Sequence, residues 1–386
     1  MWSCRCSFGV KKPTETVLRS LNCVSFRNLR DTQVEWCAGL NVITGDNGHG
    51  KTNLLEACFF LAMGRSFRTA RVDALPRRGS SFFSLSGEVS HRQVSHFLGV
   101  KAGRGLRERT LDGRQSDLGR TLEVMACLVF AAPRLALFRG GPDDRRRFLD
   151  RGIVGGKPGM VETYRDHLRA LRHKNRLLKE ARQGRPVAAL REQLAAFNDQ
   201  LAGTASTIRH ERQDYVNRLG KVLALDEGPA GLVPGKRPEI VYRPHPTLED
   251  GMTGSREDLL AAYQERADDE IRRGHALVGP QRDDLFIHQD GAEMSRFASA
   301  GQQRAALIAL KMSKMLVHKE MTGSYPVLLV DDVDAELDAD RTRRALHLLT
   351  GPYQVLVASA SVEAWAGDPR VALHLRVRDG IISRFS

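Results

Sequence analysis

The sequence predicts an α/β fold that is interrupted by a long helical insertion. A glycine-rich loop at residues 45–52 follows a short apolar run and precedes a helix-like segment. A second apolar run, residues 326–330, ends in carboxylates, and 280 residues separate Lys51 from Asp331. Apolar residues between these runs recur at the heptad spacing that is typical of packed helices. We therefore expect the two ends of the chain to meet in one domain, with the helices inserted between them.

The composition points to a globular, basic protein. The 386 residues are 41% hydrophobic and 27% charged, and they carry a net charge of +13. This balance favours a polyanionic partner, with nucleic acid ahead of a membrane surface. A general arginine bias of the source proteome is the alternative. No apolar run reaches the ~18 residues that a membrane-spanning helix needs, so no membrane segment is predicted.

The N-terminal region gives two further expectations. No apolar segment follows Lys11-Lys12, so we predict no signal peptide and interpret residues 1–16 as an unstructured extension. Four of the six cysteines lie early in the chain, and Cys4-Arg5-Cys6 is too isolated to form a zinc site. We expect free thiols in a reducing compartment, which predicts a cytoplasmic protein.

The residues around the loop read as strands and helices of a mixed domain. Residues 17–26 alternate apolar and polar side chains as a half-buried strand does, and Val34 with Trp36 indicates the return strand. Residues 40–44 form the predicted strand before the loop, and 53–61 the helix after it. Further strands are predicted at 82–89, 93–101, 107–112 and 124–130.

The loop itself reads G-x-x-x-x-G-K-T, a phosphate-binding pattern in the strand–loop–helix setting that it requires. Glycines let successive backbone N–H groups point inward at phosphate, and the helix N-terminus adds a partial positive charge. Lys51 is expected to reach the β- and γ-phosphates of ATP, and Thr52 to hold Mg²⁺. A chance glycine-rich turn is the alternative. The predicted nucleotide contacts are Gly45, Asp46, Asn47, Gly48, His49, Gly50, Lys51, Thr52 and Asn53.

A helical pattern begins near residue 160 and predicts an antiparallel hairpin of two long helices. Gly184-Arg185-Pro186 breaks the pattern between them. Residues 161–220 contain twelve Lys or Arg and seven Asp or Glu, so this arm is basic, although a solvated helical face has the same composition. The expected seam consists of Val161, Tyr164, Leu168, Leu171 and Leu178 on the first helix and Leu190, Leu194, Phe197, Leu201, Ile208, Tyr215 and Val222 on the second.

The chain then returns to mixed structure. A strand at 239–242, a helix at about 256–273 and a turn at 279–285 leading into another strand are predicted. Ser299 and Gly301 open a further helix, whose N-terminus can form a second anion site. Helix caps use the same residues, so this short pattern is weak by itself.

Asp331 and Asp332 end the apolar run at 326–330 and complete the predicted nucleotide site. Asp331 should hold Mg²⁺ directly or through water, and Asp332 should orient or deprotonate the attacking water. Carboxylates after a strand are common, so this motif gains weight only from the phosphate loop upstream. We assign catalysis to Lys51, Asp331 and Asp332, and Ser359 is a candidate γ-phosphate sensor.

The remaining motifs carry a resemblance to known families. Ser299, Gly301 and Gln302 resemble the signature motif of ABC-type ATPases, which contacts the γ-phosphate bound to the other subunit, and 332–338 resembles the following D-loop. An ABC head split by a coiled-coil arm is similar to the SMC class, and collinear motifs over about 17–360 resemble the RecF family in particular. The matching stretches are 26–28, 45–57, 64–69, 145–150, 169–175, 279–280, 282–285, 299–304 and 329–338.

The resemblance implies an ABC-type P-loop ATPase head, with a Rossmann-like core and an antiparallel β-subdomain, and an inserted helical domain carrying a short antiparallel coiled-coil arm. The head would comprise residues 17–140 and 275–386, and the insertion residues 141–274. It also implies a homodimer that depends on ATP and Mg²⁺, clamps double- and single-stranded DNA at gapped junctions, and hydrolyses ATP slowly in response to DNA. Such a protein would help RecO and RecR load RecA during gap repair, replication restart and the SOS response.

Basic residues are the candidates for DNA contact. The sequence contains no base-reading motif, so binding to phosphate with low sequence specificity is expected. The sequence departs from the family pattern at Gln281, where His is usual, at Ala132-Pro133-Arg134, and at 357–361. The DNA candidates are Arg65, Arg68, Arg71, Arg77 and Arg78 in the head and Arg172, Lys174, Arg176 and Lys179 in the arm.

Three other functions remain open from the sequence: an ABC-headed ATPase that regulates a nuclease, a transporter ATPase subunit, and a structural dimer that only binds ATP. A nuclease needs a further metal-binding carboxylate cluster, which the sequence does not show. The inserted arm disfavours a transporter subunit. A measurement of ATP turnover with and without DNA separates the DNA-dependent ATPase from the structural dimer.

Overall fold

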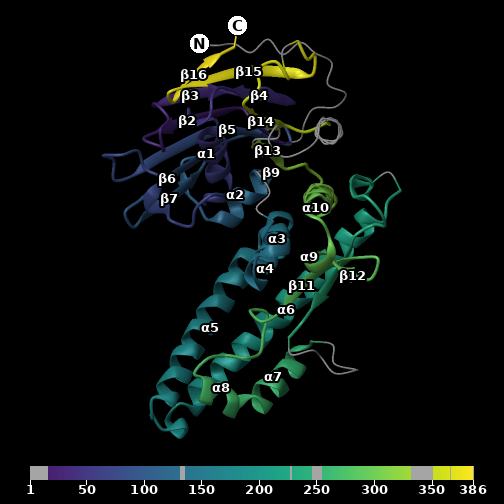
Figure 1. Ribbon diagram of the computed structural model, residues 1–386. Coiled ribbons are helices and arrows are strands. Elements are labelled where there is room, and N and C mark those ends of the chain that lie inside the picture. The colour runs from purple at the N-terminus through teal and green to yellow at the C-terminus, as the bar shows by residue number, and fades with distance from the viewer. Residues whose placement is uncertain are drawn as a thin grey trace. The chain divides into compact units, whose positions relative to one another are not determined.

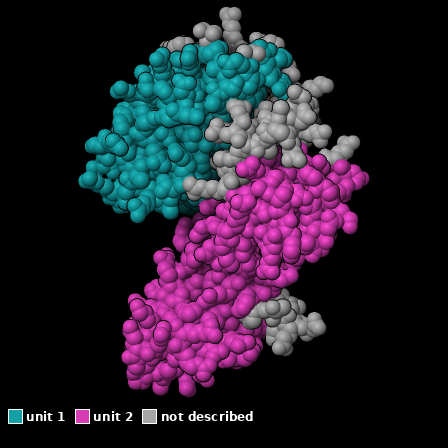
Figure 2. All heavy atoms as spheres, viewed as in Figure 1, with its two compact units in different colours: residues 1–134, 318–386 teal, residues 135–317 magenta. Residues whose placement is uncertain are grey.

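The computed structural model describes residues 16–130, 135–226, 228–245, 254–331, 351–365 and 367–385. The chain divides into two compact units (Figure 2): a head unit, residues 1–134 and 318–386, and a helical unit, residues 135–317. The sequence placed 275–317 in the head, whereas these residues pack with the helical unit. Their strands and helices pair with the inserted elements, which heptad spacing could not reveal.

A six-stranded sheet forms the core of the head unit (Figure 1). Its first five strands are parallel and the last is antiparallel. The order is β9 (Cys127–Phe130), β13 (Val327–Asp331), β14 (Val355–Ser359), β4 (Leu40–Thr44), β15 (Val371–Arg378) and β16 (Ile381–Arg384). The continuous apolar runs predicted these central strands, because a parallel sheet is covered on both faces. The carboxyl ends of β4, β13 and β14 lie at one edge of the sheet.

A second sheet in the head unit is antiparallel and has seven strands. It consists of β1 (Thr16–Leu18), β2 (Ser20–Val24), β3 (Thr32–Glu35), β5 (Phe83–His91), β6 (Val94–Gly103), β7 (Leu106–Leu111) and β8 (Arg114–Gln115). The predicted antiparallel subdomain is therefore present. The strand expected at 124–130 begins only at Cys127, because Val124 ends helix α2 (Leu118–Val124).

Helix α1 (Lys51–Met63) joins the two sheets. It packs on β13 and β14 of the core sheet and on β5 and β6 of the antiparallel sheet. Eleven of its thirteen residues are buried, and this explains why the segment is apolar on every side. The helix after the phosphate loop is thus held from both faces, and its first turn is fixed in place.

The helical unit is built on the predicted hairpin of α5 (Met160–Arg182) and α6 (Arg191–Leu223). The hairpin is not a free coiled coil, because α4 (Pro142–Gly156), α7 (Arg256–Glu265) and α8 (Ala267–Arg273) also pack against it. Leu168 was expected in the seam, but it is 53% exposed and His167 is buried instead. His167 is buried because it contacts Thr204 on α6 and Gln281 in the turn before β11 (Asp284–Gln289), so the buried face of α5 differs from a strict heptad seam.

Shorter elements complete the helical unit. A three-stranded sheet contains β10 (Glu239–Arg243), β11 (Asp284–Gln289) and β12 (Ala292–Glu293). The predicted helix at 256–273 is interrupted at Arg266 between α7 and α8. The short helices α3 (Ala136–Arg139) and α9 (Met294–Phe297) accompany the start of α10 (Ala300–Thr322), a helix that the sequence predicted.

Candidate functional site

The phosphate loop follows β4 and ends in α1, as the motif requires. Gly45 and Gly50 have φ values of 145° and 120°, which other residues rarely adopt. A Cβ atom on Gly45 would lie 2.2 Å from the carbonyl oxygen of Val377, and one on Gly50 would lie 3.0 Å from Asn28 Oδ1. Only glycine therefore fits at these two positions, and the loop has the cradle shape that an anion site needs.

Lys51 lies across this loop and is only 6% exposed. Its Nζ donates hydrogen bonds to the carbonyl oxygens of Gly45, at 2.6 Å, and Asp46, at 3.0 Å. The ammonium is thus held against the inner side of the loop. From there it can exchange these carbonyl partners for phosphate oxygens.

Thr52 and Asp331 meet at the carboxyl edge of the core sheet. The Thr52 hydroxyl donates to Asp331 Oδ1 at 2.8 Å, although the two residues are 279 positions apart. The sequence predicted that both would hold one metal ion, and the fold places their oxygens together. A hydroxyl and a carboxylate are oxygen donors of the kind that Mg²⁺ prefers, so this pair fits the ion.

A buried carboxylate, Glu56, organises the first turns of α1. It has no exposed surface, and Arg27 binds both of its oxygens, with nitrogen–oxygen distances of 2.9 and 3.0 Å. The Ser66 hydroxyl also donates to it, and Arg68 lies 3.6 Å away. Charge inside the protein is stable only when it is paired and hydrogen-bonded, and Glu56 is both.

Asparagines extend this network to the phosphate loop. Arg68 donates to Asn53 Oδ1 at 2.7 Å, and Asn53 donates to Asn28 Oδ1 at 2.7 Å. Asn28 in turn donates to the carbonyl oxygen of Gly48 at 3.0 Å. Sequence reasoning gave no role to Glu56, Asn28 or Arg27. The available signal was an acidic residue within a helix that is otherwise almost wholly apolar.

The other predicted nucleotide residues lie in separate places. His49 Nδ1 accepts a hydrogen bond from the backbone N–H of Asp379 at 2.9 Å, so the turn after β15 holds the loop. The Ser359 hydroxyl donates to the carbonyl oxygen of Ser361 at 3.0 Å, at the same sheet edge as Thr52. Asp332 and the triplet 132–134 lie outside the described residues.

Of the predicted signature residues at the start of α10, Ser299 is exposed, whereas Gly301 and Gln302 are half-buried. The Ser299 backbone N–H donates to Gln302 Oε1 at 2.8 Å, and the Gln302 N–H donates to Ser299 Oγ at 3.2 Å. These reciprocal bonds cap the helix. Ser299, Gly301 and Gln302 belong to the helical unit, whereas Lys51 belongs to the head unit.

The predicted DNA contacts lie in both units. In the head unit Arg68 and Arg71 are exposed, Arg65 lies over the ring of Phe59, and Arg77 pairs with Asp31. In the helical unit Arg172 and Arg176 are exposed on α5. An exposed basic row on this helix contains Arg165, Arg169, Arg172, Arg176 and Lys179.

Lys174 was predicted to contact DNA, and the structure corrects this. Its side chain is 1% exposed, and Nζ lies 2.7 Å from a carboxylate oxygen of Glu270 on α8. Burial lowers the pKa of the Lys174 ammonium, and the Glu270 charge opposes that effect. The lysine faces the core because a carboxylate almost a hundred residues away neutralises it there.

Within the described ranges, no group of three or more His, Cys, Asp or Glu side chains is arranged to hold a metal ion. No helix in the described part of the chain is both long and apolar enough to cross a membrane. The buried thiols Cys23, Cys58 and Cys127 form no disulfides.

Known proteins match almost the whole chain. Residues 17–372 match the family model of the RecF/RecN/SMC N terminal domain. The chain is 33% identical over 347 residues to the DNA replication and repair protein RecF of Lactobacillus delbrueckii subsp. bulgaricus, covering 88% of this chain and 89% of that protein. It is 34% identical over 377 residues to RecF of Anaeromyxobacter sp., covering 95% and 98%.

Solved structures give the same answer for the fold. The structure of the recombination mediator protein RecF with ATP, in the RecFOR pathway, has a TM-score of 0.87 and 26% identity, and the match covers 98% of this chain and 100% of that one. An Smc head domain from Pyrococcus furiosus, with an extended coiled coil, has a TM-score of 0.52, 14% identity and 96% coverage of both chains. The latter likeness concerns the fold alone, and it confirms the predicted ABC-type head. Family model, near full-length relatives and fold agree, so this chain belongs to the RecF family of SMC-like, ABC-type ATPases.

Proposed function

We propose that this protein is a recombination mediator whose ATP-dependent homodimer holds DNA and is released by slow, DNA-stimulated hydrolysis. The observation that carries the proposal is the hydrogen bond of 2.8 Å between Thr52 and Asp331, beside the phosphate loop. It joins the two halves of a nucleotide site that the chain supplies from distant segments. In the closed dimer the second copy adds contacts to the bound ATP, so ATP stabilises that state, and hydrolysis removes this stabilisation.

The main residues of the nucleotide site would each have a defined role. Lys51 neutralises the β- and γ-phosphates, and Thr52 with Asp331 holds Mg²⁺, which supplies charge stabilisation at the transferred phosphoryl group. Asp332 orients the attacking water and accepts its proton. Asn28 fixes the Gly48 carbonyl, so the loop keeps its shape when ATP is absent.

The exposed end of α10 supports a dimer. Ser299 is exposed, and Phe297, two residues earlier, has 75% of its surface in solvent. A large apolar side chain beside a capped helix N-terminus suits a surface that another copy covers when ATP is bound. We propose that Ser299, Gly301 and Gln302 contact the nucleotide of that second copy.

DNA would bind by its phosphates. The exposed basic row on α5 spans residues 165–179, about 21 Å at 1.5 Å per residue, and several successive phosphates can occupy this length. Such contacts carry little sequence information and weaken steeply with salt. We propose that the DNA is double- and single-stranded DNA at a gapped junction. We further propose that the protein acts in the cytoplasm and binds RecR, with RecO and RecA as partners in the same pathway.

The second candidate is an ABC-headed regulator of a nuclease. It would have the same ATPase head as a mediator. The partner decides between them, because a regulator would alter DNA cleavage by an associated enzyme.

ATP turnover with and without gapped duplex DNA tests the proposal. Wild-type protein should hydrolyse ATP slowly and faster with DNA, and Lys51→Met should lose at least about 100-fold of that rate. Gln213→Ala, an exposed change on α6, is the matched control and should behave as wild type. Equal turnover in wild type and Lys51→Met would contradict the assigned site, and turnover indifferent to DNA would contradict the mediator function.

A further inference from the structure

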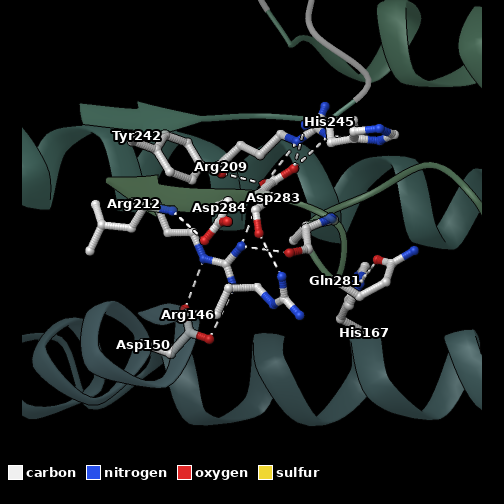
Figure 3. A network of polar contacts seen from close by, with 12 residues as sticks. Arg146, Asp150, His167, Arg209, Arg212, Tyr242, His245, Gln281, Asp283 and Asp284 are labelled. Atoms are coloured by element: carbon white, nitrogen blue, oxygen red, sulfur yellow. Dashed lines mark hydrogen bonds and ion pairs between the residues drawn. The ribbon is translucent and has the colours of Figure 1, made fainter. Parts of the chain in front are cut away.

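A carboxylate with no exposed surface, Asp283, lies beside the middle of α6 in the helical unit (Figure 3). Arg209 binds both of its oxygens, with nitrogen–oxygen distances of 2.9 and 3.2 Å. It also accepts hydrogen bonds from the Tyr242 hydroxyl and from the backbone N–H of His245, the latter at 2.9 Å. Asp283 therefore ties α6 to β10 and to the turn that precedes β11.

Arg212, one turn further along α6, adds the neighbouring helices to the network (Figure 3). It binds both oxygens of Asp150 on α4, at 2.9 and 3.0 Å, and donates to the carbonyl oxygen of Pro280 at 2.7 Å. Tyr164 on α5 donates to the same Asp150 at 2.8 Å. Both helices of the hairpin are thus joined to α4 through directional, charge-assisted bonds.

The network continues from α4 toward the signature residues. Arg146 donates to the Asp283 carbonyl oxygen at 2.6 Å. Arg145 binds both oxygens of Asp284 at 2.7 Å and donates to the carbonyl oxygen of Gly140 at 3.0 Å. Gly140 directly follows α3, so the two arginines connect Asp283 and Asp284 with that helix.

Gln303 is the last member of the network and lies within the start of α10. It is 4% exposed, and its Oε1 accepts a hydrogen bond from Arg139 of α3 at 3.3 Å. Its Nε2 donates to the carbonyl oxygens of Met294 and Ala298, at 3.0 and 3.2 Å. Gln303 therefore holds the segment that ends immediately before Ser299, and Arg139 holds Gln303.

We propose that this network is a joint that transmits the position of the hairpin to the signature serine. Arg139 and Gln303 are its positioning residues, and Asp283 is its anchor. The inference rests on the proposed function, in which DNA contacts the hairpin and Ser299 contacts ATP of the second copy. Every member lies in the helical unit, so a displacement of α5 or α6 by bound DNA reaches Ser299 within one compact body.

The geometry favours transmission over simple packing. Paired arginine–carboxylate bonds are directional, so α6 cannot shift against α4 without breaking the contact between Arg212 and Asp150. A second hydrogen bond joins α10 to α4: Lys314 on α10 donates to the Phe148 carbonyl oxygen of α4 at 2.7 Å. DNA on the hairpin can then change ATP turnover with no residue of the network contacting either ligand.

Two substitutions test the joint. Gln303→Glu keeps the acceptor for Arg139 but turns a carboxylate oxygen toward the carbonyls of residues 294 and 298. Arg145→Lys keeps the charge but loses the paired contact with Asp284. We expect each to lower the stimulation of ATP turnover by gapped duplex at least about 5-fold, the lower range of typical coupling between sites.

The affinities for ATP and for DNA show whether Gln303 and Arg145 position the signature segment or only stabilise the fold. ATP affinity of the monomer and affinity for gapped duplex should each stay within about twofold of wild type, and the melting temperature should stay close to it. The effects of Gln303→Glu and Arg145→Lys should be non-additive in the double variant, because both interrupt one path. Gln213→Ala, on α6 but outside the network, is the control and should retain full stimulation.

Several results would overturn the joint. Full DNA stimulation in either folded variant would do so, as would additive effects in the double variant. A parallel loss of ATP binding, DNA binding and melting temperature would leave the network a structural role only. If wild-type turnover proves indifferent to DNA, the proposed function fails independently. In that case the joint is tested by ATP-dependent dimerisation. Gln303→Glu should weaken this dimerisation, and unchanged dimerisation would contradict the inference.

Discussion

Each unit of the molecule contains a fully buried carboxylate held by arginines, and the two differ in what they anchor. Glu56 in the head unit lies one turn into α1, and its network reaches the phosphate loop through Asn28. Asp283 in the helical unit lies beside α6, and its network reaches the signature segment through Gln303. One anchor fixes the site that binds ATP, whereas the other fixes the segment that would contact ATP of a second copy.

This difference suggests one design for an ABC-type dimer, in which one network supports ATP binding and another supports the response of the signature segment to DNA. A nucleotide loop has to keep one shape, and a short network within one turn of it is sufficient. In the proposed dimer the signature segment would respond to DNA on the hairpin, and the proposed path across α6, α4 and α3 would connect the two. Each of the following substitutions changes residues on one side of this comparison.

The largest effect is expected in the head unit, from Glu56→Gln. The change leaves Arg27 with an uncharged partner in a buried site, which should cost about 3 kcal/mol of unfolding free energy. ATP affinity should fall with it, because Arg68, Asn53 and Asn28 lose their common support. Calorimetry and nucleotide titration check both effects.

Glu35→Gln is the matched control, since Glu35 is exposed on β3. It should leave stability and ATP affinity at the wild-type level. Unchanged ATP affinity in Glu56→Gln, in protein that is still folded, would show that the network supports α1 without shaping the loop.

A smaller effect is expected in the helical unit, from pH. Burial lowers the pKa of His167 from 6.5 to about 4, with Arg212, Asp150 and Asp283 as charged neighbours. The unfolded state binds the extra proton between these values, so stability present at neutral pH is lost as the pH falls from 6.5 toward 4. At pH 5 the loss should be about 2 kcal/mol.

Denaturant unfolding of the helical unit at pH 7 and pH 5 measures this loss. His167→Gln should remove that share of the pH dependence, and His275→Gln, at an exposed position, should keep it. An equal pH dependence in wild type and His167→Gln would mean that His167 is protonated without cost in the folded protein.

The smallest expected effect is on DNA affinity, and it distinguishes the exposed face of α5 from its buried face. Arg172→Ala combined with Arg176→Ala should weaken binding to gapped duplex about 5-fold and reduce the salt slope by about 2, because two phosphate contacts are lost. Lys174→Met should lower stability, since Glu270 loses its partner, and should leave the salt slope unchanged. A reduced salt slope in Lys174→Met, or none in the arginine pair, would contradict the assignment of surface and core.

The same contrast explains how much the sequence could predict. The phosphate loop, Thr52 and Asp331 follow from local spacing and from the rule that parallel strands share one carboxyl edge, and the structure joins Thr52 to Asp331 as expected. The hairpin and most strands follow from periodicity. The arginine partners of Glu56 and Asp283 could not be predicted, because the fold brings them close from distant segments.

Errors arose for the same reason. Lys174 reads as a solvated cation on a basic helix, yet Glu270 neutralises it from another helix. Leu168 fits the heptad seam, yet the neighbouring His167 is the buried residue, because it contacts Thr204 on α6 and Gln281 in the turn before β11. In both places a contact distant in sequence outweighs a local pattern.

Sedimentation velocity with ATP and gapped duplex DNA tests the central claim most directly. Wild-type protein should form dimers on DNA with ATP and remain monomeric with ADP. Ser299→Arg should bind ATP as a monomer but fail to dimerise, because its signature surface is blocked. A wild-type protein that stays monomeric with ATP and DNA, or a Ser299→Arg protein that dimerises as wild type does, would contradict the account.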